Sequence, residues 1–368
     1  MTRSFLDTAS KLPAWFNNSG PDSDVVISSR IRLARNLVHR TFPYHASANE
    51  RKLVYNEIAG ILNSETKIPH FELVNFSKLE KLEQQFFVEK RVVSPDLMNM
   101  EGQRGVALDS TQRINIMINE EDHLRIQGLD SGYQPEILWE MLNKLDDTLG
   151  RRLRFAFDLR RGFLTCCPTN SGTGLRISFL MHLPGLVLTK AIDAVLQGAS
   201  QMGISTRGFF GEHSEVVGNF FQLSNQATMG AHESEFLSTT EKIICEVIKH
   251  ERDSRERLCN EAHLEITDKI YRAYGILLHA RTLSVAECLN LTSALRLGIN
   301  IGIFETLTIE ELNRITLLSM PAHLQIFRKK DLDETEISVA RAELVRELLT
   351  KRKRKKRSPR SEEKDLCS

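Results

Sequence analysis

Hydrophobic positions follow two different periods along the first part of the chain. Apolar residues that recur three and four positions apart predict amphipathic helices, and short apolar or alternating runs predict strands. Helices are predicted over residues 48–64, 78–89, 134–149 and 186–202, and strands over 25–27, 106–109, 114–118, 123–129, 151–157, 175–183, 204–210 and 219–223. Because strands follow strands and helices come between only some of them, we expect an α+β fold, an antiparallel-rich sheet flanked by helices.

From about residue 254 the pattern becomes helical throughout. Helices are predicted over residues 255–275, 284–297, 308–314, 321–326 and 335–349, with no strand pattern among them. The chain therefore divides into four parts. These are an N-terminal arm (1–23), a mixed domain (24–254), an all-helical C-terminal domain (255–350) and a basic tail (351–368).

Composition changes this picture mainly at the tail. The chain is 41% hydrophobic and 26% charged, which is ordinary for a soluble globular protein. The last 18 residues carry +6 (eight basic residues in 351–360, then a net −2), so the overall charge of +1 leaves about −5 for the rest. A block of like charge is typical of disorder, and nucleic-acid binding by the remainder is not expected.

The cysteines indicate a compartment. None of the six forms a Cys-x-x-Cys pair, and neither a signal peptide nor a long apolar run is evident. We therefore expect a cytoplasmic protein with reduced thiols, without a metal site in the protein and without membrane contact.

Candidate chemistry lies at three junctions between strands and loops, in Asn119–Arg125, Arg161–Arg176 and Arg207–His213. Each combines an arginine with a glutamate or a cysteine. Arginine forks bind phosphates in a bidentate manner, and carboxylates can hold a guanidinium and take its proton. The combination suits phosphoryl transfer onto nitrogen. Taken singly, each stretch has a simpler interpretation, such as a buried cysteine beside a turn or a solvated basic edge, and Arg35 is expected to be structural or solvated.

Four motifs also resemble a known family. Asn-Glu-Glu-Asp-His-Leu-Arg, Cys-Pro-Thr-Asn-x-Gly-Thr and Arg-Gly-x-x-Gly-Glu resemble the signatures of phosphagen (guanidino) kinases, as does Ser28–Arg32. They occur in the family's order, within about residues 20–250. The resemblance implies an eight-stranded antiparallel sheet for the mixed domain. The helical domain that follows resembles that of bacterial protein-arginine kinases, which lack the domain preceding the catalytic domain of arginine and creatine kinases.

The resemblance also implies roles. Glu121 and Glu212 would bracket the acceptor guanidinium, with Glu121 as the general base, and Cys167 would lie near a non-reacting nitrogen. ATP would bind with Mg²⁺ held mainly through its phosphates. The implied nucleotide-binding residues are Ile27, Ser28, Ser29, Arg30, Ile31, Arg32, Arg91, Arg125, Arg176, Ile177, Ser178, Phe179, Leu180, Arg207, Gly208, Phe209, Phe210, Gly211 and Glu212.

The expected function is ATP-dependent phosphorylation of arginine side chains in proteins, marking them for a chaperone–protease. Expected partners are proteins with exposed arginines, a small zinc-binding activator, the chaperone–protease and a second copy of the chain. Two alternatives remain open: a kinase of a free guanidino compound, and a non-catalytic adaptor that acts through its helical domain.

One departure from the family yields a prediction. The related kinases carry an Arg-Asp-x-x-Arg-Ala run that binds a phosphorylated arginine, but here Ile337 and Ser338 replace the first two residues while Arg341 and Ala342 remain. Each missing partner of a charged ligand costs ~1–3 kcal/mol. We expect free phosphoarginine to leave the initial rate nearly unchanged when it is titrated into the assay. A saturable change at micromolar concentration would contradict this prediction.

Overall fold

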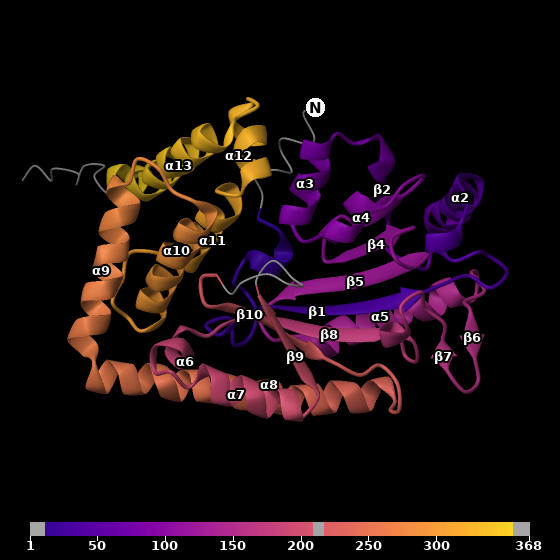
Figure 1. The fold of residues 1–368 in the computed structure, drawn as a ribbon, viewed down its shortest axis with the longest axis horizontal. Helices are drawn as coiled ribbons and strands as arrows, with labels where there is room; N and C mark the ends of the chain where they lie inside the picture. Colours follow the sequence, from indigo (N-terminus) through magenta and orange to yellow (C-terminus); the bar gives the residue numbers. More distant parts are fainter. Residues whose placement is uncertain (1–11, 209–216, 356–368) are drawn as a thin grey trace, which may run out of the picture.

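The computed structural model describes residues 12–208 and 217–355. It confirms the predicted fold class, a sheet flanked by helices and followed by a helical region. Figure 1 shows the sheet at the centre, helices α6 to α8 below it, and helices α9 to α13 on the left. The predicted site residues Phe209, Phe210, Gly211 and Glu212 lie outside the described residues, as do the start of the arm and most of the tail.

Eight strands form the main sheet, in the order β2-β3-β4-β5-β1-β8-β10-β9, and every neighbouring pair is antiparallel. Their bounds are β1 Val26–Arg35, β2 Phe71–Asn75, β3 Gly105–Asp109, β4 Ile114–Ile118, β5 Leu124–Ser131, β8 Leu175–His182, β9 Ile204–Gly208 and β10 Phe220–Asn225. A separate hairpin joins β6 Phe157–Asp158 to β7 Gly162–Phe163.

Strand β1 was predicted too short. The pattern predicted a strand that ended at Ile27, with the arginines after it, but β1 continues through Arg35. Its buried polar residues disguised the period, because Ser28 and Ser29 occupy interior positions of the strand. Strand β2 was missed, and most of the strand predicted over 151–157 is instead a turn and a bridge.

The helices agree more closely with the pattern. They are α2 Ala48–Ser64, α3 Lys81–Glu89, α4 Pro95–Asn99, α5 Pro135–Gly150, α6 Pro184–Leu188, α7 Ile192–Gln201, α8 Glu233–Glu261, α9 His263–His279, α10 Val285–Asn300, α11 Ile309–Leu318, α12 Pro321–Arg328 and α13 Glu334–Lys355, with short 3-10 turns at η1 Ala14–Phe16, η2 Pro43–His45, η3 Phe76–Lys78 and η4 Pro168–Asn170.

Three differences have local causes. The single helix predicted over 186–202 is divided at Lys190, whose φ of 61° is left-handed and cannot continue a helix. The first part of helix α8, before residue 255, was not predicted, and the helix continues through the predicted domain boundary at residue 254. Helix α13 reaches Lys355, within the segment predicted to be a disordered tail.

The two faces of the sheet differ in character. One face packs against helices α2, α5 and α8 in a large apolar core that includes Val54, Leu142 and Ile244. The other face carries smaller apolar clusters, in which η1, α10 and α11 cover β1, β5, β8 and β10, while α3 and α12 pack beside β3 and β4. This second face also bears the arginines of the candidate site.

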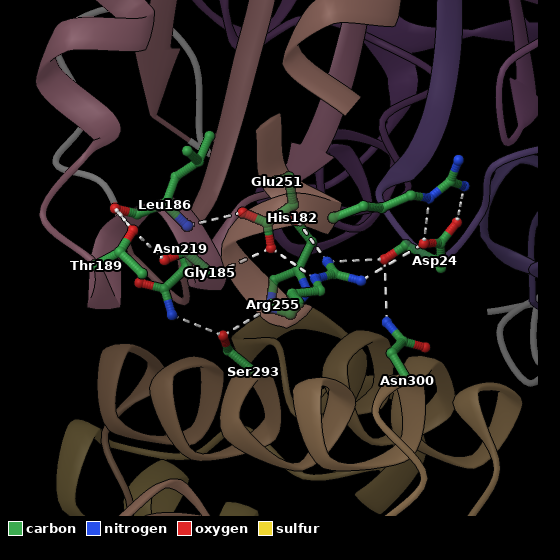
Figure 2. Close-up of polar contacts among 11 residues, drawn as sticks. Asp24, His182, Gly185, Leu186, Thr189, Asn219, Glu251, Arg255, Ser293 and Asn300 are labelled. Atoms are coloured by element: carbon green, nitrogen blue, oxygen red, sulfur yellow. Dashed lines mark hydrogen bonds and ion pairs between the residues drawn. The ribbon is translucent and has the colours of Figure 1, made fainter. Parts of the chain in front are cut away.

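A buried polar network fastens the helical region to the sheet (Figure 2). Ser293 of α10 lies 2.8 Å from Nε2 of His182 and accepts a hydrogen bond of 3.0 Å from Asn219. Asn300 donates to the carbonyl oxygen of Asp24 at 3.0 Å, and Arg255 donates to the same oxygen at 3.1 Å. Helix α10 is thus joined through side chains to the end of β8 and to the segment that precedes β1.

Arg35 is structural, as one of the two sequence interpretations held. Its guanidinium pairs with Asp146 of α5 at 2.7 Å and donates to the carbonyl oxygen of Thr173 at 2.9 Å. It lies 3.5 Å from the centroid of the Phe163 ring. The side chains of Arg35 and Asp146 are only 2% and 10% exposed. The pair therefore joins β1 to α5 and to the loop that precedes β8.

Removing one partner of this pair leaves a buried charge. We expect Asp146→Ala to lower the free energy of unfolding by ~3–5 kcal/mol, measured by urea denaturation. The control is Glu261→Ala, which breaks the exposed Arg257–Glu261 pair (side chains 65% and 62% exposed) and should cost less than about 1 kcal/mol. Similar losses in the two variants would show that the buried pair has no special role.

Candidate active site

A cavity of about 690 Å³ lies on the arginine-bearing face of the sheet, beneath the helical region. Strand alternation places its basic residues, because Arg30 and Arg32 lie two apart on β1 and share a face. Arg32 is directly opposite Arg176 of β8, and Ala34 is opposite Arg125 of β5. The arginines that line the cavity are Arg30, Arg32, Arg91, Arg125, Arg176 and Arg207. The structure therefore brings together every arginine that the sequence predicted for the site.

Electrostatics favour an anionic ligand here. Burial and the charges of Arg91, Arg125, Arg176 and Arg207 lower the pKa of Arg30 well below its ordinary value. Burial lowers the pKa of Arg91 to about 10. Like charges facing one another across strands are destabilising, so a polyanion that enters the cavity relieves their repulsion.

Polar side chains hold the arginines in place. Arg30 donates from Nε to the hydroxyl of Ser178 at 3.1 Å and from its terminal nitrogen to Gln222 at 3.0 Å. Arg176 donates to the hydroxyl of Ser224 at 3.1 Å. The Nε of Arg32 is buried and has no hydrogen-bond partner among the described residues. These contacts leave donors available for phosphate oxygens.

The three consecutive acids that follow β4 have separate tasks. Glu120 is fully buried and pairs with Arg125; although burial raises the pKa of Glu120, Arg125 and Ser94 hold it below its ordinary value. Asp122 is also buried and accepts a hydrogen bond of 2.7 Å from the amide of Cys166. Glu121 alone of the three lines the cavity.

Glu121 is suited to accept a proton. Its side chain is half-buried, and burial raises its pKa above the ordinary value of 4.5, although Arg125 opposes the shift. Oε2 of Glu121 lies 3.4 Å from the side-chain nitrogen of Asn170. Because Asn170 ends the 3-10 turn that follows Cys167, this contact joins the acidic loop to the cysteine loop.

Cys167 also lines the cavity, with its sulfur 2.9 Å from the hydroxyl of Thr169. Its neighbour Cys166 does not line the cavity. Burial raises the pKa of Cys166, and the charge of Asp122 reinforces the shift. The two adjacent thiols therefore differ in surroundings.

Other predicted nucleotide-lining residues lie below the cavity rather than in its wall. The side chains of Ile31, Ile177 and Phe179 point into the core on the far face of the sheet, because strand residues alternate in direction. Ser178 supports Arg30. Nine of the residues predicted to bind the nucleotide are buried and do not line the cavity: Ile27, Ser28, Ser29, Ile31, Ile177, Ser178, Phe179, Leu180 and Gly208.

Part of the cavity wall gave no signal in the sequence. Trp15 and Phe16 of the arm stack at 4.6 Å and line it, as do Leu317 and Met320 of the helical region. These apolar residues come from distant segments, and nothing in the sequence distinguishes them from residues of the hydrophobic core. A Trp-Phe pair in an arm without periodicity was the only hint.

Within residues 12–208 and 217–355, no group of three or more His, Cys, Asp or Glu side chains could hold a metal ion. In the same part of the chain, no helix combines the length and apolar character needed to cross a membrane.

Comparison with known proteins first defines the class. The family model for the "ATP:guanido phosphotransferase, C-terminal catalytic domain" matches residues 53–254. The duplicated taurocyamine kinase from Schistosoma mansoni shares the fold with a TM-score of 0.59 and 23% identity, over 67% of this chain and 35% of that chain. Lombricine kinase does so with a TM-score of 0.56 and 25% identity, over 66% of this chain and 70% of that one. The fold and the family model are those of the guanidino kinases, which are phosphotransferases.

The particular family follows from the whole length. The family model for the "Protein-arginine kinase McsB C-terminal domain" matches residues 263–360. The protein-arginine kinase of Desulforamulus reducens is 39% identical over 338 residues, which is 91% of this chain and 95% of the relative. The protein-arginine kinase of Bacillus subtilis is 39% identical over 341 residues, which is 92% of this chain and 93% of the relative. The chain belongs to the protein-arginine kinase family, as the resemblance of its helical domain predicted.

The contrast between the two thiols can be tested. We expect Cys167→Ser to retain the fold and lose much of the activity, and Cys166→Ser to retain both. In the wild type, iodoacetamide should label Cys167 before Cys166, because the raised pKa of Cys166 leaves less thiolate to react. Mass spectrometry of the labelled peptide gives the two rates. Faster labelling of Cys166 would reverse the assignment.

Proposed function

We propose that this enzyme transfers the terminal phosphoryl group of ATP to the guanidinium group of arginine side chains in proteins. One observation carries the proposal: a single cavity combines six arginines with Glu121 and Cys167. A cluster of arginines suits a triphosphate, and a carboxylate beside a thiol suits a cationic nitrogen acceptor. Family membership supports a protein as the acceptor, since the relatives are named protein-arginine kinases.

The arginines bind and orient the phosphates and compensate the charge that develops during transfer. Mg²⁺, held mainly through the phosphates of ATP, would supply further charge neutralisation. Glu121 accepts the proton of the attacking nitrogen as the N–P bond forms and the bond to ADP breaks. Cys167 contacts a nitrogen that does not react. By resemblance to the family, Glu212 would bind the acceptor guanidinium together with Glu121.

The setting of the reaction is part of the proposal and rests on family resemblance. The enzyme works in the cytoplasm as a homodimer, a small zinc-binding protein activates it, and a chaperone–protease receives the phosphorylated proteins. The acidic charge of the chain without its tail does not favour nucleic acid as a partner.

A single assay tests the reaction. The full chain is incubated with ATP, Mg²⁺ and an unfolded basic protein, and the phosphate bound to the protein is measured before and after mild acid. A phosphoguanidinium is acid-labile, whereas a phosphate ester is not, so acid-labile phosphate on arginine is the expected product. A parallel reaction with free arginine separates the alternative: phosphorylation of the free compound alone would refute the protein substrate.

Loss of the general base has a defined signature. We expect Glu121→Gln to lower kcat by ~10² or more while the affinity for ATP stays nearly unchanged. In the wild type, the rate should fall at acid pH with an apparent pKa above 4.5, because the carboxylate must be ionised to accept a proton and burial raises its pKa. The pH profile of kcat checks both points. A variant that keeps more than about a tenth of the rate would exclude Glu121 as the base.

A further inference from the structure

Glu89, the last residue of α3, joins the sheet domain to the helical region. Its carboxylate accepts hydrogen bonds from the backbone amides of Ala322 at 2.8 Å and of His323 at 3.0 Å, at the start of α12. The same carboxylate lies 2.6 Å from Nδ1 of His323, whose side chain is fully buried. Burial lowers the pKa of His323, which favours the neutral ring, and its Nδ1–H donates a hydrogen bond to the carboxylate of Glu89. Figure 1 shows α12 next to α3.

The chain that leaves Glu89 enters the cavity within two residues. The carbonyl oxygen of Lys90 accepts a hydrogen bond of 3.0 Å from the indole of Trp15, and that of Arg91 accepts one of 3.0 Å from Gln127 of β5. Arg91 has a φ of 59°, in the left-handed region that is costly for a non-glycine residue. Its guanidinium carbon lies 5.5 Å from the centroid of the Trp15 ring. Such a conformation persists only while its surroundings hold it.

The helical region reaches the same part of the cavity. Leu317, Met320 and Pro321 line the cavity. Pro321 immediately precedes Ala322 and His323, whose backbone amides donate hydrogen bonds to Glu89. Phe86 of α3 packs against the ring of His323 with 4.5 Å between centroids. The end of α3, the start of α12 and Arg91 therefore form one packed unit at the cavity wall.

We infer that Glu89 is a positioning residue for Arg91: by capping α12 it holds the end of α3, and the helical region thereby sets the geometry of the phosphate-binding arginine. The inference rests on the proposed function only in that Arg91 binds the phosphates of ATP. The role belongs to the carboxylate, because the two backbone amides donate to different oxygens, and a glutamine would present an N–H₂ group to one of these donors.

A second buried carboxylate supplies a matched control. Glu251 of α8 accepts hydrogen bonds of 2.9 Å from the amides of Gly185 and Leu186 at the start of α6, as Figure 2 shows. Its side chain is fully buried, as that of Glu89 nearly is, but Glu251 does not line the cavity. Substitution of either carboxylate removes two hydrogen bonds to backbone amides at the start of a helix. Glu251 also pairs with Arg255 at 2.6 Å, as Glu89 does with His323, but only Glu89 leads to an arginine of the site.

The experiment measures ATP affinity by calorimetry, together with KM and kcat, in the full chain. We expect Glu89→Gln to raise the Kd and KM for ATP about tenfold, the effect of losing one charge-assisted hydrogen bond, with a smaller change in kcat at saturating ATP. Glu251→Gln should lower the thermal midpoint to a similar degree and leave the Kd within about twofold of the wild type. An unchanged Kd in Glu89→Gln, or equal increases in both variants, would overturn the inference.

His323→Ala decides the matter if Glu89→Gln does not fold. This variant removes one of the three contacts of Glu89 and leaves both amide contacts. His323 does not line the cavity, so a rise of about threefold in the Kd for ATP shows an effect transmitted through Glu89, and an unchanged Kd refutes it. Calorimetry needs no acceptor. A wild type that binds ATP but phosphorylates no protein would refute the proposed function alone.

Discussion

Repulsion among the arginines gathered on one face of the sheet is the constraint on which the rest of the structure depends. Arg30, Arg32 and Arg176 come from neighbouring strands, and the charges around them lower the pKa of Arg30 and Arg32 beyond the effect of burial. No apolar contact can stabilise such an arrangement directly. The sheet tolerates it because the opposite face packs against α2, α5 and α8 in the largest core of the molecule.

The remaining polar contacts restrict how those arginines can move. Glu120 pairs with Arg125, Ser178 and Gln222 accept from Arg30, and the chain holds the loops around them through buried pairs such as Arg35–Asp146. Arg30 and Arg125 are held in this way while they line the cavity. The site is thus arranged before a phosphate arrives, which is what catalysis by charge stabilisation requires.

The helical region is part of this arrangement rather than an appendage. Its residues line the cavity, its helix α10 is fastened to the sheet through Ser293 and Asn300, and the start of α12 is capped by Glu89. The family match for the catalytic domain ends at residue 254 and that for the C-terminal domain begins at residue 263, but α8 runs without a break to Glu261. A rigid helix therefore links two regions that share one cavity.

The sequence by itself determined the fold class and most helices, because hydrophobic period is a local property. Its motifs, through their resemblance to the family, also predicted the arginines of the cavity. It could not show that Ile31 and Phe179 face the core while Arg30 and Arg32 face the cavity, since the buried serines of β1 hid the alternation. It also could not show that Glu120 and Asp122 are buried while Glu121 lines the cavity, or place Trp15, Leu317 and Glu89 at the same wall. Those assignments were decided only by the tertiary structure, because they depend on packing between segments distant in the chain, and such packing leaves no local pattern.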